Sequence, residues 1–166
     1  MHITELDWEL ISLILKQFDN YKWCIRFLMT CKQLYSNEYL IKYIKDYFTE
    51  YKVDAYGNQY WYFNNKLHRE NDKPAIVNIH GDQYWYFNGK RHREEDKPAI
   101  INKYGRQWFL NGKCHRESDK PAIIYLDGHE EYWVNDKLHR DHEKPAIIYP
   151  CGSKEYWING KFIKNE

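Results

Sequence analysis

The 166-residue chain has no surplus of charge of either sign, since 25 basic residues are balanced by 24 acidic ones. Proteins that bind a phosphate backbone carry a clear positive excess, so no nucleic-acid partner is expected. No apolar stretch approaches the roughly 18 residues of a membrane span. The first residues also lack the basic region and apolar run of a secretory signal. The sequence therefore predicts neither a stable membrane anchor nor export.

The chain also lacks paired cysteines. Its four cysteines are scattered, and none stands beside another at the spacing that ligates zinc: Cys24, Cys31, Cys114 and Cys151. We expect free thiols in a reducing compartment, with no disulfide, metal or other cofactor.

Neither glycine nor proline occurs between residues 3 and 50. Apolar residues recur there at three- and four-residue spacings, which predicts helices. Thr4 can cap the first helix, and the third is expected to run through Leu40, Ile41, Ile44 and Phe48. The sequence thus predicts a small helical domain of three short helices over residues 1–50.

The rest of the chain, residues 51–166, is repetitive. Glycines recur at spacings of 24, 24, 23 and 24 residues and open blocks 1 to 5: Gly57, Gly81, Gly105, Gly128 and Gly152. Block 5 is partial, so there are about four and a half copies. A fixed period of this size is typical of stacked units. An enzyme needs one asymmetric pocket, so the repetition favours a non-enzymatic protein.

Each block alternates with a period of two and then turns. Asn88-Gly89, Asn111-Gly112 and Asn159-Gly160 are the preferred pair for a two-residue hairpin turn, because both positions need positive φ. A later strand opens with proline, as in Pro74-Ala75-Ile76. The predicted fold class is α+β: a small N-terminal helical bundle followed by an elongated antiparallel β-meander of hairpin repeats.

The two faces of the first strand in each block differ. One face is apolar in every copy, and we expect it to form the core: Trp61 and Phe63, Trp85 and Phe87, Trp108 and Leu110, Tyr132 and Val134, Tyr156 and Ile158. The other face becomes more polar toward the carboxyl end, where Glu131 and Glu155 occur. It is expected to present half-exposed aromatic side chains to a protein partner around Phe109, Trp133 and Trp157.

A His-Arg pair recurs in every full block: His68-Arg69, His92-Arg93, His115-Arg116 and His139-Arg140. In-register histidines on separate strands diverge from any single ion, so we expect each to hydrogen-bond a neighbouring carbonyl or acid rather than a metal. The arginines begin Arg-Glu-x-Asp-Lys groups. These could bind an anion, but their acids cancel the charge, which favours a structural ladder of ion pairs between blocks.

The Asn-Gly-Lys-x-His sequence, followed by a strand and a glycine turn, resembles the MORN repeat over residues 57–166. The charged extension Arg-Glu-x-Asp-Lys-Pro-Ala is similar to MORN-variant arrays of large DNA viruses of amoebae, including marseillevirus-like ones. This resemblance implies an intracellular viral protein, found in the host cytoplasm, the virus factory or the virion.

The amino terminus resembles an F-box, in the sequence Leu-Asp-Trp-Glu-Leu-Ile at residues 6–11 and in the apolar spacing that follows. That resemblance implies binding of a host cullin-ligase adaptor by five residues: Leu6, Glu9, Leu10, Ile14 and Leu15. The expected function is a protein–protein interaction adaptor whose repeats bind a client. The alternative is a structural virion or virus-factory component in which the helices only cap the array. The client and the oligomeric state stay open.

Overall fold

The computed structural model describes Lys16, Arg26 and residues 38–166. The chain divides into two compact units, residues 1–51 with 62–66 and residues 52–61 with 67–166. Helix α4 spans Glu38–Phe48 and buries Leu40 and Ile44. It matches the third predicted helix, and the remainder of the predicted bundle lies outside the described residues. No helix among the described residues is long and apolar enough to cross a membrane.

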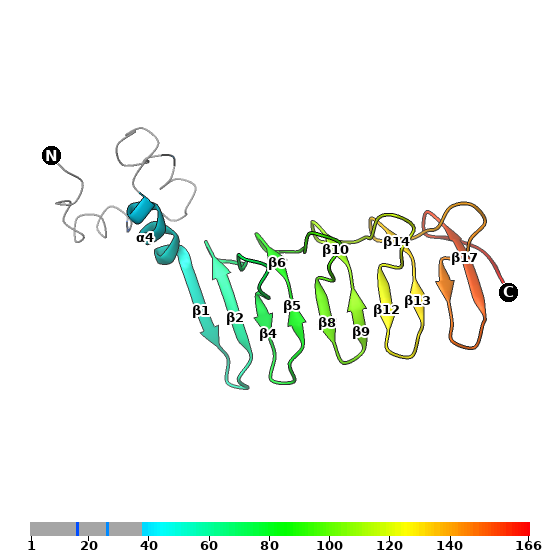
Figure 1. Cartoon of the computed structure of the whole chain (residues 1–166), viewed down its shortest axis with the longest axis horizontal. Coiled ribbons are helices and arrows are strands. Elements are labelled where there is room, and N and C mark those ends of the chain that lie inside the picture. Colours follow the sequence, from blue (N-terminus) through cyan, green and yellow to red (C-terminus); the bar gives the residue numbers. More distant parts are fainter. Residues whose placement is uncertain (1–15, 17–25, 27–37) are drawn as a thin grey trace. The chain divides into compact units, whose positions relative to one another are not determined.

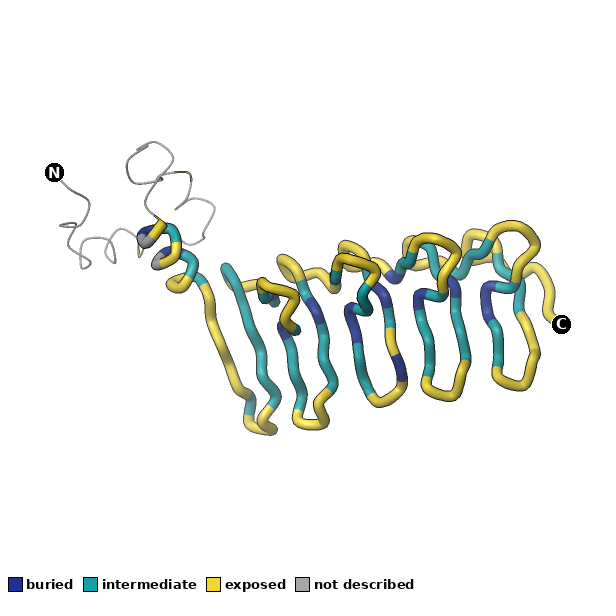
Figure 2. The backbone as a smooth tube through the Cα atoms, in the orientation of Figure 1, coloured by how far each residue is buried: buried dark blue, intermediate teal, exposed yellow. Residues whose placement is uncertain are grey.

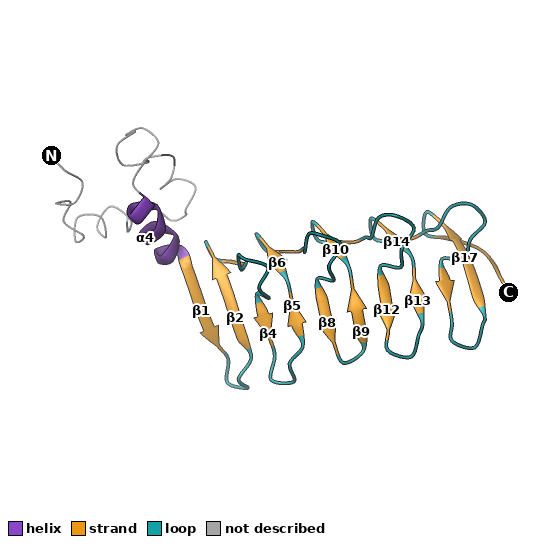
Figure 3. Ribbon diagram, in the orientation of Figure 1, coloured by secondary structure: helices purple, strands orange, loops and turns teal. Residues whose placement is uncertain are grey.

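The predicted meander is confirmed. Successive strands pair antiparallel along one 12-stranded main sheet, in the order β1-β2-β4-β5-β8-β9-β12-β13-β16-β17-β18, with β3 beside β2 (Figures 1 and 3). Their bounds are β1 Thr49–Val53, β2 Gln59–Phe63, β3 Lys66–Leu67, β4 Ile76–Val77, β5 Gln83–Tyr84, β8 Ile100–Asn102, β9 Gly105–Gln107, β12 Ile123–Tyr125, β13 Glu130–Glu131, β16 Ile147–Ile148, β17 Lys154–Ile158 and β18 Lys161–Asn165.

Blocks 2 to 4 each add a separate two-stranded hairpin. The hairpins pair β6 (Tyr86–Phe87) with β7 (Lys90–Arg91), β10 (Phe109–Leu110) with β11 (Lys113–Cys114), and β14 (Trp133–Val134) with β15 (Lys137–Leu138). At the tips, Asn88 and Gly89 have φ of 50° and 81°, and Asn111 and Gly112 have 52° and 90°. The predicted positive-φ turns are therefore confirmed.

The alternating pattern predicts one continuous first strand in each block, but in blocks 2 to 4 this strand is interrupted. It changes its hydrogen-bonding partner at the central aromatic residue. The backbone N–H of Trp85 donates to the carbonyl of Ala99, the residue before β8 (2.8 Å). Its own carbonyl accepts the N–H of His92 from the hairpin (3.2 Å). Trp108 and Tyr132 repeat the arrangement with Ala122 and Ala146. Each block consequently turns a corner at this residue.

The core follows that corner along the array (Figure 2). Trp85, Trp108 and Tyr132 are buried, beside one fully buried alanine in each full block: Ala75, Ala99, Ala122 and Ala146. The prediction that the whole apolar face is core is wrong for its second residue in blocks 2 and 3, whereas Val134 in block 4 is only partly exposed. Phe87 is 51% exposed and Leu110 is 39% exposed, because the chain has already left the main sheet there.

The glycine turns connect main-sheet strands at the ends that face away from the hairpins (Figure 1). Side-chain oxygens stabilise these turns. Asn78 Oδ1 accepts the N–H groups of His80 and Asp82 at 2.9 and 2.8 Å. Block 3 has one residue fewer than the others, and its Gly105 consequently lies within β9. A Cβ on Gly105 would lie 2.1 Å from the carbonyl oxygen of Ile124. Only glycine allows the two backbones to approach so closely.

Candidate functional site

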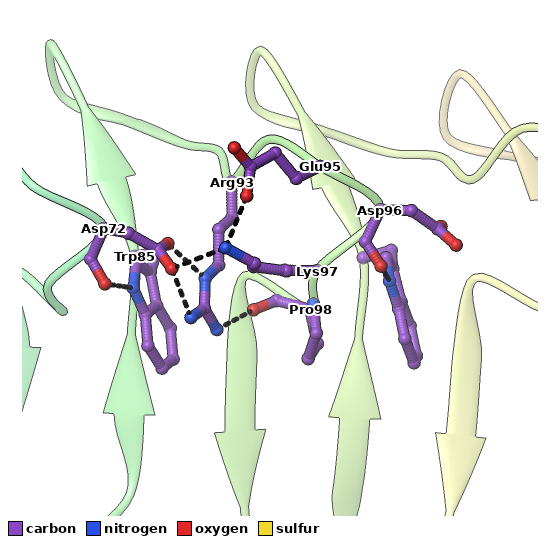
Figure 4. A network of polar contacts seen from close by, with 8 residues as sticks. Asp72, Trp85, Arg93, Glu95, Asp96, Lys97 and Pro98 are labelled. Atoms are coloured by element: carbon purple, nitrogen blue, oxygen red, sulfur yellow. Dashed lines mark hydrogen bonds and ion pairs between the residues drawn. The ribbon is translucent and has the colours of Figure 1, made fainter.

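The most elaborate arrangement in the array is a cluster that joins each of the four full blocks to its full neighbour. In its first copy, Asp72 of block 1 accepts hydrogen bonds from Arg93 Nε (2.7 Å) and Nη2 (3.0 Å) in block 2. Lys97 Nζ reaches the same carboxylate at 3.0 Å (Figure 4). We call this unit the ionic clamp. It recurs as Asp96 with Arg116 and Lys120, and as Asp119 with Arg140 and Lys144.

Each clamp arginine is fixed within its own block as well. Arg93 Nη1 donates to the carbonyl of Pro98 (3.1 Å), and Arg93 Cζ lies 3.7 Å from the ring centroid of Trp85. Trp85 Nε1 in turn donates to the backbone carbonyl of Asp72 (3.1 Å), so the indole also bridges the two blocks. A planar guanidinium suits this position because it can stack on a ring and bind a carboxylate with two N–H groups at once.

The clamp also determines the acidity of its carboxylates. Hydrogen bonds from Arg93, and then from Lys97, lower the pKa of Asp72 to about 2. The same contacts from Arg116 and Lys120 hold the pKa of Asp96 well below its ordinary value, and Arg140 and Lys144 act likewise on Asp119. The three carboxylates therefore stay charged through the neutral and mildly acidic range.

The clamp aspartates depend on an unusual backbone turn, which follows the His-Arg pair in each full block and which we call the acidic kink. The two central residues of the turn have positive φ in all four full blocks, as in Asn71 (61°) with Asp72 (53°) and Glu95 (59°) with Asp96 (53°). Asparagine and aspartate enter this region more readily than most residues. The recurrence of Asp at the second position, in Asp72, Asp96 and Asp119, is the signal that could have located the turn.

The histidines tie consecutive hairpins together, in a manner different from the prediction. His68, His92 and His139 each use Nδ1 to accept a backbone N–H from the turn of the next block, at 3.1 to 3.2 Å. The predicted partner was a carbonyl or an acid; in His92–Glu94 (3.6 Å) and His139–Asp141 (3.3 Å) an acid lies near Nε2 instead of Nδ1. The Nδ1 atom must be unprotonated to accept this bond.

Block 3 departs from the histidine pattern. His115 Nδ1 is buried and has no hydrogen-bond partner. The following turn is Asn135-Asp136 instead of Asn-Gly, and Asp136 Oδ1 accepts the N–H of Cys114 at 2.7 Å. The aspartate side chain thus replaces the histidine as the connection between blocks 3 and 4.

Three pockets lie beside the clamps, one for each pair of neighbouring full blocks. Their volumes are about 470, 330 and 520 Å³. Each pocket is lined by the acidic kinks, the His-Arg pair and the two outer residues of a hairpin strand. Those hairpin residues are Tyr86 and Phe87 in the first pocket, Phe109 and Leu110 in the second, and Trp133 and Val134 in the third.

The glutamates near the carboxyl end each connect two aromatic side chains. Glu155 accepts Trp157 Nε1 (2.8 Å) and Tyr149 OH (2.9 Å). Glu131 accepts Trp133 Nε1 at 2.7 Å. Glu131 and Glu155, which make this face more polar toward the carboxyl end, therefore act as hydrogen-bond acceptors for the indole and phenol groups. Trp133, Trp157 and Phe109 are all partly exposed.

The predicted site residues fall into three sets. Leu6, Glu9, Leu10, Ile14 and Leu15 lie outside the described residues. The arginines Arg93, Arg116 and Arg140 come together with the carboxylates of preceding blocks, and Arg69 stacks 3.6 Å from the centroid of Trp61. Phe109 and Trp133 line neighbouring pockets, whereas Trp157 lines none of the three. In the described part of the chain, no three His, Cys, Asp or Glu side chains are grouped to hold a metal ion.

The fold and the clamps together define an open antiparallel β-repeat array whose four full blocks are joined by the same ionic clamp. In comparisons with known proteins, no family model and no curated protein matches the chain.

Proposed function

We propose that this protein is a non-enzymatic adaptor that brings two proteins together. Residues 1–50 would bind a host cullin-ligase adaptor through the F-box-like residues, and the array would bind a client around Phe109, Trp133 and Trp157. The observation that carries the proposal is repetition. The clamp recurs at each of three block boundaries and a pocket accompanies each one. Such a surface suits an extended protein contact better than a single reaction.

The ligase half of the proposal is tested by titrating the full-length purified chain with a recombinant cullin-ligase adaptor in a calorimeter. We expect saturable binding that is lost in Leu10→Asp. The matched control is Leu126→Asp in the array, where Leu126 is 76% exposed at the tip of a turn, and this variant should bind normally. No binding by the wild-type chain would remove the ligase function.

The client half is tested by affinity purification from host cells that contain the tagged protein. Proteins that bind the aromatic face should be recovered with the wild type and with Leu126→Ser, and lost with Phe109→Ser. If Phe109→Ser recovers the same proteins in the same amounts, the client site lies elsewhere.

A structural role is the second candidate, and the clamps favour it, because a network that joins all four full blocks suits a stiff component of a larger assembly. Quantitative mass spectrometry of purified virions separates the two roles. A structural component would be present at a fixed, high copy number relative to the capsid protein, whereas an adaptor would be scarce or absent.

A further inference from the structure

The acidic kink of block 3 differs from the others at one exposed position. The first of its two positive-φ residues is Ser118 (64°), where blocks 1, 2 and 4 have asparagine, glutamate and histidine. The Ser118 hydroxyl has no hydrogen bond within the described part of the chain. Residues 51–166 contain one other serine and no threonine. In that serine, Ser153, the hydroxyl oxygen accepts a hydrogen bond from Cys151 Sγ (3.3 Å).

Block 2 shows what an acidic group does at this position. Glu95 has nearly the same φ as Ser118, 59° against 64°, and its carboxylate binds Lys97 Nζ at 2.6 Å. Lys97 therefore bonds two acids, Glu95 in its own kink and the clamp aspartate of the preceding block. Among the described residues, the equivalent Lys120 of block 3 bonds only its clamp aspartate, at 2.6 Å. The second acid is missing because Ser118 carries no charge.

The surroundings of Ser118 on the side of block 4 favour added negative charge. Ser118 lines the second and third pockets. In the second pocket four acids face three bases, and in the first pocket four acids face two. Only the third pocket has more bases than acids, with Arg116, Lys120, Arg140 and Lys144 against Glu117, Asp119 and Asp141.

The kink of block 3 is also held by fewer backbone bonds. In blocks 1, 2 and 4 the lysine N–H donates to the carbonyl three residues earlier, at 3.2 to 3.4 Å. The described residues of block 3 form no such bond, and its whole kink, residues 117–120, is exposed. An exposed segment with few backbone bonds opens at low cost, which favours its entry into the active site of a modifying enzyme.

We propose that Ser118 is a phosphorylation site and that its phosphate binds Lys120. A serine kinase with ATP and Mg²⁺ supplies the phosphoryl group. The Ser118 oxygen bonds to the γ-phosphorus, the bond from that phosphorus to the bridging oxygen breaks, and ADP leaves. The hydroxyl proton passes to the catalytic base of the kinase.

The phosphate can take the part that Glu95 has in block 2. Its oxygens lie the same number of bonds from Cα as the carboxylate oxygens of glutamate, so they can reach Lys120 as Glu95 reaches Lys97. Phosphorylation adds a charge of about −1.5 to −2. The base surplus of the third pocket thereby becomes a negative excess, and the fold of the array is retained. This inference goes beyond the proposed adaptor function and does not depend on it.

Peptide mapping tests the modification itself. The full-length tagged protein is purified from host cells with phosphatase inhibitors and digested with trypsin, which leaves the Lys120–Pro121 bond intact. The peptide of residues 117–137 contains Ser118 as its only serine. Mass spectrometry should find an added HPO₃ group on it, localised to Ser118 by fragmentation. The group should be absent from Ser118→Ala and retained in the matched control, Ser153→Ala.

Phosphorus NMR tests the contact with Lys120. Phosphoserine is placed at position 118 during bacterial synthesis of the full-length chain, and the phosphorus chemical shift is followed against pH. The second pKa of the phosphate is ordinarily about 6. A neighbouring ammonium favours the dianion and lowers this pKa, so Lys120→Gln should raise it by about 0.5. Lys113→Gln, at an exposed residue of β11 in the same block, should leave it unchanged. Circular dichroism checks that both variants are folded.

Two outcomes would overturn the proposal: no phosphate on Ser118 in the protein from host cells, or the same phosphate pKa with and without the Lys120 side chain. Neither outcome bears on the ligase half of the proposed function, which depends on residues 1–50. The client test at Phe109 is equally independent, because it uses a different side chain and a different measurement.

Discussion

Arg93 reaches back across a block boundary and binds the carboxylate of Asp72 through Nε and Nη2, at 2.7 and 3.0 Å. The same guanidinium is held in its own block by a proline carbonyl and an indole ring. Because this one side chain binds groups in both blocks, its removal should weaken the contact between blocks 1 and 2 without exposing a large part of the core.

Replacing Arg93 with alanine should lower the free energy of unfolding by roughly 1–2 kcal/mol, since it removes charge-assisted hydrogen bonds and a ring contact at a partly exposed site. Arg106→Ala is the matched control, because Arg106 is an exposed strand residue outside the clamps. Urea unfolding followed by tryptophan fluorescence measures both. Equal destabilisation by the two variants would mean that the clamp contributes nothing specific.

Stability should also depend on acid. The pKa of Asp72 is lowered to about 2, and those of Asp96 and Asp119 are lowered too. A carboxyl whose pKa is depressed by folding contributes its full stability above the unfolded value near 4 and loses it as the pH falls through the folded value. We therefore expect the free energy of unfolding to decline from about pH 4 to about pH 2.

The asparagine variants assign that decline to the clamp. Asp72→Asn should be less stable than the wild type at neutral pH, and its stability should fall less steeply below pH 4. Urea titrations at a series of pH values give both quantities. A slope as steep as that of the wild type would assign the acid sensitivity to other carboxyls.

Gly105 and Gly81 form a matched pair for backbone crowding. Both have positive φ, yet a Cβ on Gly105 would collide with the Ile124 carbonyl, whereas a Cβ on Gly81 meets nothing within 4 Å. Gly105→Ala should therefore destabilise the array by about 3 kcal/mol or more, and Gly81→Ala by only about 1 kcal/mol. Thermal melts of the two variants distinguish the effects, and similar losses would contradict the close approach of the two strands.

The two cysteines of the array should differ sharply in reactivity. Burial raises the pKa of the Cys114 thiol to about 12, whereas hydrogen bonding with Ser153 lowers the pKa of the exposed Cys151 thiol. A brief maleimide treatment of the native protein should label Cys151 and spare Cys114, and both should react in urea. Peptide mapping by mass spectrometry reads each site separately. Rapid native labelling of Cys114 would mean that the hairpin opens readily.

The sequence was a good guide to features governed by local chemistry. The Asn88-Gly89 sequence predicted a hairpin turn, because both central positions of such a turn require positive φ. The regular spacing of the glycines predicted the meander. The exposure of Phe87 could not be predicted in the same way. A period of two is the same whether a strand continues or transfers to another partner, and the transfer at Trp85 depends on hydrogen bonds to Ala99 and His92.

The clamp was only partly predictable for a similar reason. The repeated Arg-Glu-x-Asp-Lys groups indicated ion pairs, but they do not say which acid each arginine binds. Glu94 adjoins Arg93 in sequence, yet the partner is Asp72, which the left-handed turn of the previous block directs toward the boundary. The histidine bonds likewise depend on where the next turn places its amide groups.

The single missing histidine bond at His115 has a consequence for how the array comes apart. Blocks contact mainly their neighbours, so unfolding can proceed as in a row of linked units in which each link has its own strength. Blocks 3 and 4 share the same clamp as the other full blocks, but their hairpins are linked through Asp136 and Cys114 instead of a histidine. Under a mechanical load along the array, we therefore expect this boundary to separate at a different force from the boundaries that have the histidine bond.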